Sequence, residues 1–148
     1  AHPMSDAATT PRTTIWRNRV EFGDCDPAGI VYYPNFLRWF DASSRHFFVE
    51  CGVPPWRDTA VTHGIIGTPV LDVSARFVKP ASYGDDIEVH TSVVEWNAKT
   101  FVQRHVLMHA GEVLCEGRDV RAFVIRHPDD PVRMKAVPAP AEFRALCE

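Results

Sequence analysis

Apolar side chains recur at helical spacing over residues 34–51, and this is the clearest pattern in the chain. Pro34 suits a first helical position, because its missing N–H leaves no hydrogen bond unmade there. Gly52, Pro54 and Pro55 mark the end, since glycine favours the position after a helix and proline cannot continue it. The residues that recur at this spacing are Phe36, Leu37, Phe40, Ser44, Phe47, Phe48 and Cys51. The pattern therefore predicts one long helix that is buried along one side.

The segments on either side of this helix contain β-branched residues in alternating patterns. They predict strands over residues 13–22, 66–78, 87–93, 101–108 and 113–125, with a bend at 67–69. Short helices are expected at 55–63 and 141–147, and 128–140 is expected to be a proline-rich crossing. Because short turns join antiparallel neighbours, we predict an α+β fold in which one helix packs on an antiparallel sheet. The open edges of such a sheet favour homo-oligomers.

Length, charge and composition narrow the class of protein. The 148 residues suit one domain, which we predict at 13–148. Residues 1–12 are predicted to be a flexible N-terminus, in which residues 1–3 before Met4 are interpreted as a cloning remnant. The net charge of −3 does not indicate a nucleic-acid surface. No apolar run approaches the roughly 18 residues of a membrane span, so we expect no membrane association.

Cysteine and histidine spacing bears on metal binding and on the cellular compartment. The four cysteines form no Cys-x-x-Cys pair, and the seven histidines form no His-Glu-x-x-His motif. We therefore expect no metal and no cofactor. Unpaired thiols of this kind are typical of a cytoplasmic protein.

The turn before the long helix carries the candidate chemistry. It places Asp24, Cys25 and Asp26 close to a helix N-terminus, where partial positive charge can hold an oxyanion. Asp26 precedes a proline, which favours an extended backbone that can direct its side chain out of the turn. The alternative is an aspartate that satisfies only its own turn. Cys25 could be a nucleophile, but the flanking carboxylates disfavour a thiolate, so we interpret it as a packed thiol. Asp24 could be a second acid, and we interpret it as an acceptor that holds the loop.

These residues give the chain a family resemblance. Asp26, Pro27, Gly29 and Pro34 form the pattern Asp-Pro-x-Gly-x-x-x-x-Pro, and further matching blocks lie at 51–52, 54–57, 67–69 and 101–105. With them the chain resembles the hot-dog-fold acyl-CoA thioesterases, and within that family the branch that acts on aromatic acyl groups. The resemblance implies a hot-dog fold, an antiparallel sheet wrapped around one long helix. It also implies an acyl-CoA substrate, active sites at a dimer interface, and a homotetramer made of two dimers.

The resemblance implies two catalytic groups. Asp26 matches the aspartate that attacks the thioester carbonyl or activates the water that does, and both roles stay open here. Tyr33 matches a residue whose backbone N–H, at the helix N-terminus, holds the developing oxyanion. Its ring can pack at the helix start at the same time, so we expect Tyr33→Phe to change oxyanion binding little.

The resemblance also implies substrate-binding residues. Asp41 and Thr68 match positions that bind a ring hydroxyl in hydroxybenzoyl-specific enzymes, although Asp41 could instead pair with Arg45 one helical turn away. Lys99 is the one charge kept from a basic run that grips the phosphates of CoA. Other basic residues could compensate, or could be ordinary exposed arginines of the sheet face: Arg76, Lys79, Arg104, Arg118, Arg121 and Arg126. We interpret His63 and His105 as ordinary helix-end and strand histidines.

We therefore predict an acyl-CoA thioesterase that hydrolyses a hydroxybenzoyl or benzoyl thioester to the free acid and CoA. The first alternative is a thioesterase for short or medium aliphatic acyl-CoA, or for acyl carrier protein. The second is a non-catalytic acyl-CoA sensor, against which Asp26 argues, because a binder has no need of a carboxylate aimed at the carbonyl. A dehydratase is disfavoured, since no histidine-centred motif lies at the helix start.

Overall fold

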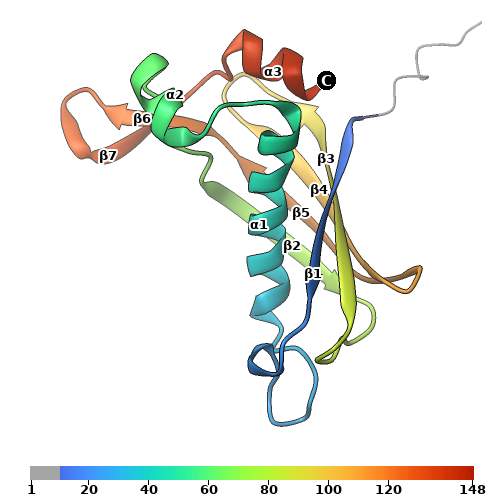
Figure 1. The fold of residues 1–148 in the computed structure, drawn as a ribbon. Coiled ribbons are helices and arrows are strands. Elements are labelled where there is room, and N and C mark those ends of the chain that lie inside the picture. Colours follow the sequence, from blue (N-terminus) through green and yellow to red (C-terminus); the bar gives the residue numbers. More distant parts are fainter. Residues whose placement is uncertain (1–10) are drawn as a thin grey trace, which may run out of the picture.

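The computed structural model describes residues 11–148, and the predictions for residues 1–10 lie outside this range. Figure 1 shows α1 lying along one face of a curved sheet, which confirms the predicted α+β fold. The helices are α1 (Pro34–Cys51), α2 (Trp56–Thr62) and α3 (Ala141–Cys147), with a 3-10 turn at Phe22–Asp24. The strands are β1 (Thr13–Arg19), β2 (Val70–Phe77), β3 (Asp86–Trp96), β4 (Phe101–His109), β5 (Glu112–Arg121), β6 (Phe123–His127) and β7 (Asp130–Val137). None of the described helices is long and apolar enough to cross a membrane.

The main sheet has the strand order β1-β3-β4-β5-β2, and every pairing in it is antiparallel. One expectation about neighbours was wrong, because β2 and β3 follow each other after a short connection but do not pair. β2 pairs with β5, where Phe77 faces Cys115. The connection instead crosses beside the segment that precedes α1, and there the Ala81 carbonyl accepts a hydrogen bond of 2.8 Å from the Val31 N–H. Strands β1 and β2 are therefore the two edges.

The C-terminal third differs from the prediction in two places. The strand expected over 113–125 is broken at Ala122, after which β6 leaves the main sheet and pairs with β7. The proline-rich segment 128–140 is largely strand β7 and not a crossing. Pro131 is tolerated because β7 pairs on one side only, so a missing N–H breaks no second ladder. Figure 1 shows this hairpin extending away from the main sheet.

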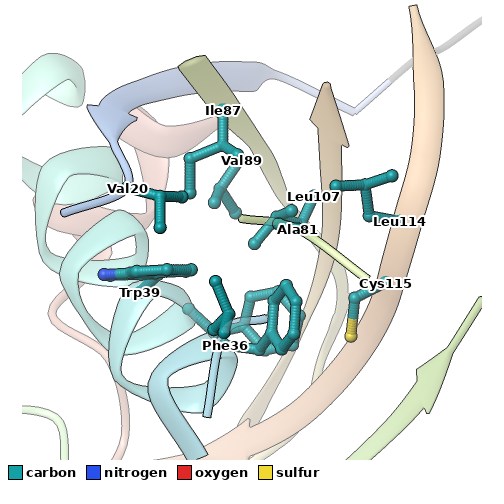
Figure 2. Packing of buried hydrophobic residues seen from close by; sticks show 11 residues of the cluster. Val20, Phe36, Trp39, Ala81, Ile87, Val89, Leu107, Leu114 and Cys115 are labelled. Atoms are coloured by element: carbon teal, nitrogen blue, oxygen red, sulfur yellow. The ribbon is translucent and has the colours of Figure 1, made fainter. Parts of the chain in front are cut away.

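The core contains two apolar clusters along α1. The first includes Phe36, Trp39 and Phe40 and packs on β3, β4 and β5, as Figure 2 shows. The second includes Phe47 and Phe48 and packs on Phe101, Phe123 and Phe143. Between them α1 presents Ser43 and Ser44, which are fully buried. The middle of the core is thus polar, and it positions part of the candidate site.

The helix lies very close to β5 near Gly117. A Cβ atom built at this position would lie 2.3 Å from Cε2 of Phe40, a separation that real Cβ atoms do not show. The Phe40 ring also stacks on the His105 ring, with a centroid distance of 5.1 Å and an interplanar angle of 10°. The absence of a side chain at Gly117 therefore sets how closely α1 approaches the sheet.

Candidate active site

The Asp26 side chain sits on a tight turn. The Asp26 carbonyl accepts the Gly29 N–H at 2.9 Å, and the Asp26 N–H donates to the Ile30 carbonyl at 2.8 Å. Oδ1 of Asp26 accepts the Ala28 N–H at 2.8 Å, so the role of turn stabiliser considered from the sequence is real. Oδ2 has no hydrogen-bond partner among residues 11–148. One carboxylate oxygen thus orients the group, and the other is available for chemistry.

Asp24 fastens this loop to the first turn of α1, as predicted. Oδ2 of Asp24 accepts the Glu21 N–H at 2.9 Å, and Oδ1 accepts Nη2 of Arg38 at 3.0 Å. The Asp24 carbonyl accepts Nδ2 of Asn35 at 2.8 Å. Cys25 packs against the first apolar cluster, as expected of a structural thiol. The loop is therefore fixed relative to the helix N-terminus.

The N-terminus of α1 offers an unsatisfied donor. Tyr33 is the N-cap residue, with φ −54° and ψ −33°, and Pro34 follows it. Its backbone N–H donates to no other residue in the described range. No acidic side chain occupies the first turn of α1, so the partial positive charge of the helix is not neutralised there. The Tyr33 ring contacts Phe77 edge-on. The backbone N–H, at the start of the helix, is placed where it can bind an anion.

A pocket of about 320 Å³ lies farther along α1. Asp41 and Thr68, the two residues predicted to bind the acyl ring, both line it. The sequence offered Arg45 as an alternative partner of Asp41, but the ion pair that forms joins Oδ1 of Asp41 to Nη2 of Arg121 at 3.0 Å. Nη1 of Arg121 also donates to the Thr68 carbonyl at 3.0 Å. The structure therefore brings Asp41 and Thr68 together through one arginine. The lining residues are Asp41, Ser44, Arg45, Trp56, Ile66, Gly67, Thr68, Pro69, Arg121, Val124 and Met134.

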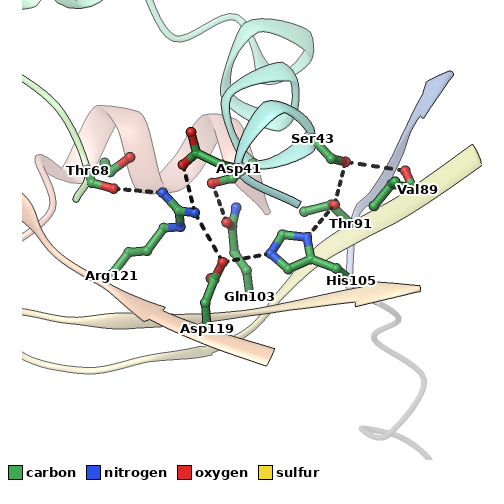
Figure 3. Close-up of polar contacts among 10 residues, drawn as sticks. Asp41, Ser43, Thr68, Val89, Thr91, Gln103, His105, Asp119 and Arg121 are labelled. Atoms are coloured by element: carbon green, nitrogen blue, oxygen red, sulfur yellow. Dashed lines mark hydrogen bonds and ion pairs between the residues drawn. The ribbon is translucent and has the colours of Figure 1, made fainter. Parts of the chain in front are cut away.

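A chain of buried polar groups lies behind this pocket (Figure 3). Oδ2 of Asp119 accepts from Nη2 of Arg121 at 3.1 Å and contacts Nε2 of His105 at 2.9 Å. Nδ1 of His105 contacts the Thr91 hydroxyl at 2.8 Å, and that hydroxyl contacts Ser43 Oγ at 2.6 Å. We call these five residues, Arg121, Asp119, His105, Thr91 and Ser43, the buried polar chain. Each is at most 5% exposed.

The carboxyl group of Asp119 is held in its charged form. Burial alone would raise its pKa, because desolvation disfavours the carboxylate. Hydrogen bonding and charge from His105, and then from Arg121, outweigh this effect, so the pKa of Asp119 lies below its ordinary value. The chain is therefore a charged element inside the core.

Arg121 and Asp119 are the residues whose place the sequence reasoning missed. It treated Arg121 as a candidate for CoA phosphates or as an exposed arginine, whereas Arg121 is 5% exposed. A signal was present in the alternation of β4 and β5. Gln103 and His105 share one face of β4, and Asp119 and Arg121 share one face of β5. The register places Gln103 opposite Asp119, so all four residues face α1 in the core.

Lys99 lies far from Asp26 within one subunit. β1 runs toward the Asp26 loop, and β3 is antiparallel to β1, so the end of β3 and the turn that carries Lys99 lie at the opposite end of the sheet. Two of the other basic candidates, Arg76 and Arg104, both pair with Glu116, at 3.2 and 3.5 Å. Within residues 11–148 no three histidine, cysteine or carboxylate side chains are grouped to hold a metal ion.

Comparison with known proteins gives consistent matches. Residues 20–146 match the model of the thioesterase-like superfamily. The chain is 44% identical to 4-hydroxybenzoyl-CoA thioesterase from Pseudomonas sp. strain CBS-3, over 92% of this chain and 98% of that protein. It superposes on an Asp-to-Asn mutant of 4-hydroxybenzoyl-CoA thioesterase complexed with 4-hydroxybenzoyl-CoA, with a TM-score of 0.87, 42% identity, and coverage of 93% and 99%. A gentisyl-coenzyme A thioesterase superposes with a TM-score of 0.77 at 29% identity, covering 91% and 100%.

Proposed function

The chain belongs to the thioesterase-like superfamily and is an acyl-CoA thioesterase, and we propose that it hydrolyses 4-hydroxybenzoyl-CoA or a closely related aromatic thioester to the free acid and CoA. The observation that carries this proposal is the spacing of two polar groups along α1. The Tyr33 N–H has no partner among residues 11–148, and the exposed carboxylate of Asp41 stands at the edge of a pocket. Eight residues of helix correspond to about 12 Å. A hydroxybenzoyl group with a hydrogen bond at each end has a comparable length.

Asp26 and Tyr33 are proposed as the catalytic groups. Oδ2 of Asp26 attacks the thioester carbonyl to give a mixed anhydride that water opens, or it takes the proton from the attacking water. In either route the carbonyl oxygen becomes an oxyanion. The Tyr33 N–H and the partial positive charge of α1 support its binding, since both are fixed before the reaction begins.

Asp41 and Thr68 are proposed to bind the far end of the acyl group. The Asp41 carboxylate would accept a hydrogen bond from the ring hydroxyl, with Thr68 as a second residue that lines the pocket. Both catalytic and pocket groups then act on the same substrate. A site of this kind discriminates against an analogue without the hydroxyl, because the carboxylate is left without its partner.

We further propose a homotetramer in which subunit contacts complete the site. Edge strand β2 exposes Val70, Leu71, Val73 and Phe77, which is unusual for an edge that faces only water. The 11 residues of β3 span about 36 Å, so Lys99 is remote from the Asp26 of its own subunit. A Lys99 that holds CoA phosphates would then come from another subunit. Light scattering tests the assembly, and a monomer would contradict it.

The decisive experiment measures free-thiol release from 4-hydroxybenzoyl-, 3-hydroxybenzoyl-, benzoyl-, hexanoyl- and palmitoyl-CoA. Wild type and Asp26→Asn are compared at equal concentration. Rapid release from 4-hydroxybenzoyl-CoA that is lost in the variant would support the reaction, the acyl class and the residue together. A preference for an aliphatic ester would retain the reaction and reject the aromatic pocket. Tight binding of the esters without release would reject the enzyme.

A further inference from the structure

We propose that Arg121 is a positioning residue that determines specificity for a hydroxylated acyl ring, an inference that rests on the proposed function. Arg121 contacts no part of the reacting thioester in this scheme. It acts through Asp41, whose carboxylate it holds at the edge of the pocket. Asp41 is proposed to accept a hydrogen bond from the ring hydroxyl of the substrate, and Arg121 fixes the position of that acceptor.

The guanidinium of Arg121 joins three separate parts of the fold. Nη2 lies 3.0 Å from Oδ1 of Asp41 on α1 and 3.1 Å from Oδ2 of Asp119 on β5. Nη1 donates at 3.0 Å to the carbonyl of Thr68, in the loop before β2. A planar guanidinium can serve these acceptors at once, whereas a lysine ammonium is a compact point charge that cannot reproduce the fork. Asp41 and Thr68 are therefore both held by one planar group.

The two carboxylates that share Arg121 have different surroundings. The side chain of Asp119 is 1% exposed and is held by His105 on its other side. The side chain of Asp41 is 71% exposed, and Arg121 is its ion-pair partner within the described residues. An exposed aspartate on a helix samples several rotamers, and Arg45 one turn away offers a competing partner. Arg121 selects the rotamer in which the carboxylate stands beside Thr68.

The buried polar chain fixes the position of Arg121. Arg121 is 5% exposed, and its guanidinium is connected through Asp119, His105 and Thr91 to Ser43 of α1. This chain contains a hydroxyl, an imidazole and a carboxylate in contact one after the other, which is the order found in a catalytic triad. They belong to Thr91, His105 and Asp119. They are at most 1% exposed, so no substrate reaches them, and the arrangement is a support and not a second catalytic centre.

The test compares kcat/KM for 4-hydroxybenzoyl-CoA with that for benzoyl-CoA in wild type, Arg121→Met and Arg121→Lys. Arg17→Met is the matched control, since Arg17 also forms an ion pair, with Glu88 at 3.2 Å, but does not line this pocket. We expect Arg121→Met to lower the ratio of the two values by about tenfold or more, mainly by slowing the hydroxylated substrate. Arg17→Met should keep the wild-type ratio. In an Asp41→Asn background, Arg121→Met should change the ratio no further.

The outcomes separate this inference from the proposed function. A parallel loss on both substrates in Arg121→Met would show a merely structural role and overturn the inference, as would an unchanged ratio. If Arg121→Met does not fold, Arg121→Lys carries the test by the same criterion, because it keeps the charge and loses the fork. If wild type and the Arg121 variants prefer the hydroxylated ester to the same degree, only the role of Arg121 is refuted. A wild type that releases thiol from neither aromatic ester refutes the proposed function as well.

Discussion

The Asp26 loop and the buried polar chain are built in opposite ways. The bonds that shape the turn at Asp26 join residues two to four positions apart, and the group is partly exposed. The bonds of the buried polar chain join residues from α1, β3, β4 and β5, and one of them spans 48 positions from Ser43 to Thr91. Local bonding lets a reactive group be changed at little cost in stability. Long-range bonding makes the acyl pocket depend on the packing of the whole domain.

The largest effect that would test this contrast is expected for Asp26→Asn. The asparagine Oδ1 can still accept the Ala28 N–H, so the turn is preserved while the carboxylate is lost. We expect kcat to fall roughly 10²–10⁴-fold, and the free energy of unfolding to change by less than about 0.5 kcal/mol. Steady-state kinetics and urea denaturation measure the two quantities. Near-normal turnover would remove Asp26 from the mechanism, and a large loss of stability would remove the contrast.

A second effect on activity is expected at the helix N-terminus. Tyr33→Pro deletes the backbone N–H at a residue whose φ of −54° suits proline, and no hydrogen bond to a described residue is lost. We expect kcat to fall about 10²–10³-fold. Tyr33→Phe is the matched control, which keeps the N–H and should stay within about twofold of wild type. Equal losses in both variants would point to the side chain and against the oxyanion role.

The buried chain should show the converse behaviour, with stability as the main loss. Asp119→Ala leaves Arg121 and His105 without their shared carboxylate in the core. We expect a loss of about 3–5 kcal/mol in the free energy of unfolding, as for other broken buried pairs. Asp129→Ala, at an exposed turn, serves as the control and should change it by less than about 0.5 kcal/mol. Urea denaturation monitored by circular dichroism measures this loss. A loss below 1 kcal/mol would mean that the chain adds little.

The smallest effect that sharpens the contrast is one of pH. The pKa of Asp119 is below its ordinary value in the folded state, so as pH falls the unfolded chain takes up its proton first. The stabilisation is complete above about pH 3.9 and is lost as pH falls through the folded pKa. Between about pH 5 and pH 3, wild type should therefore lose more stability than Asp119→Asn. Exposed pairs such as Arg19–Asp86 are present in both wild type and Asp119→Asn, so their contribution to the pH dependence of stability is the same in the two proteins. If the free energy of unfolding falls equally steeply with pH in both proteins, the lowered pKa of Asp119 is contradicted.

The sequence predicted what is encoded locally. The long helix, its proline start and its glycine end were found because each signal lies within a few residues of the feature. The same holds for the Asp26 turn and for Asp24 as a loop fastener. The break at Ala122 and the β6–β7 hairpin were missed, because proline content at 128–140 outweighed weak strand signals and nothing local reveals a one-sided strand.

The pocket shows where local signals end. Asp41 has a plausible partner four residues away, and helix periodicity alone favours Arg45. The actual partner, Arg121, approaches from β5 because the register of β4 and β5 turns an alternating polar face toward α1. That register depends on strand order, which short connections predicted wrongly for β2 and β3. The sequence can thus predict the chemical role of a residue without predicting which residue it pairs with.

The closeness of Phe40 to Gly117 has a consequence for how this protein would look in a mutational survey. Phe40 directly precedes Asp41, and any side chain at position 117 must push the Phe40 ring away from β5. The displacement would carry the Asp41 carboxylate off the Arg121 guanidinium. Position 117 would therefore be as intolerant of substitution as a residue that binds substrate, although it has no functional group and lies inside the core. Intolerance at this site would reflect the short distance between α1 and the sheet, and not contact with a ligand.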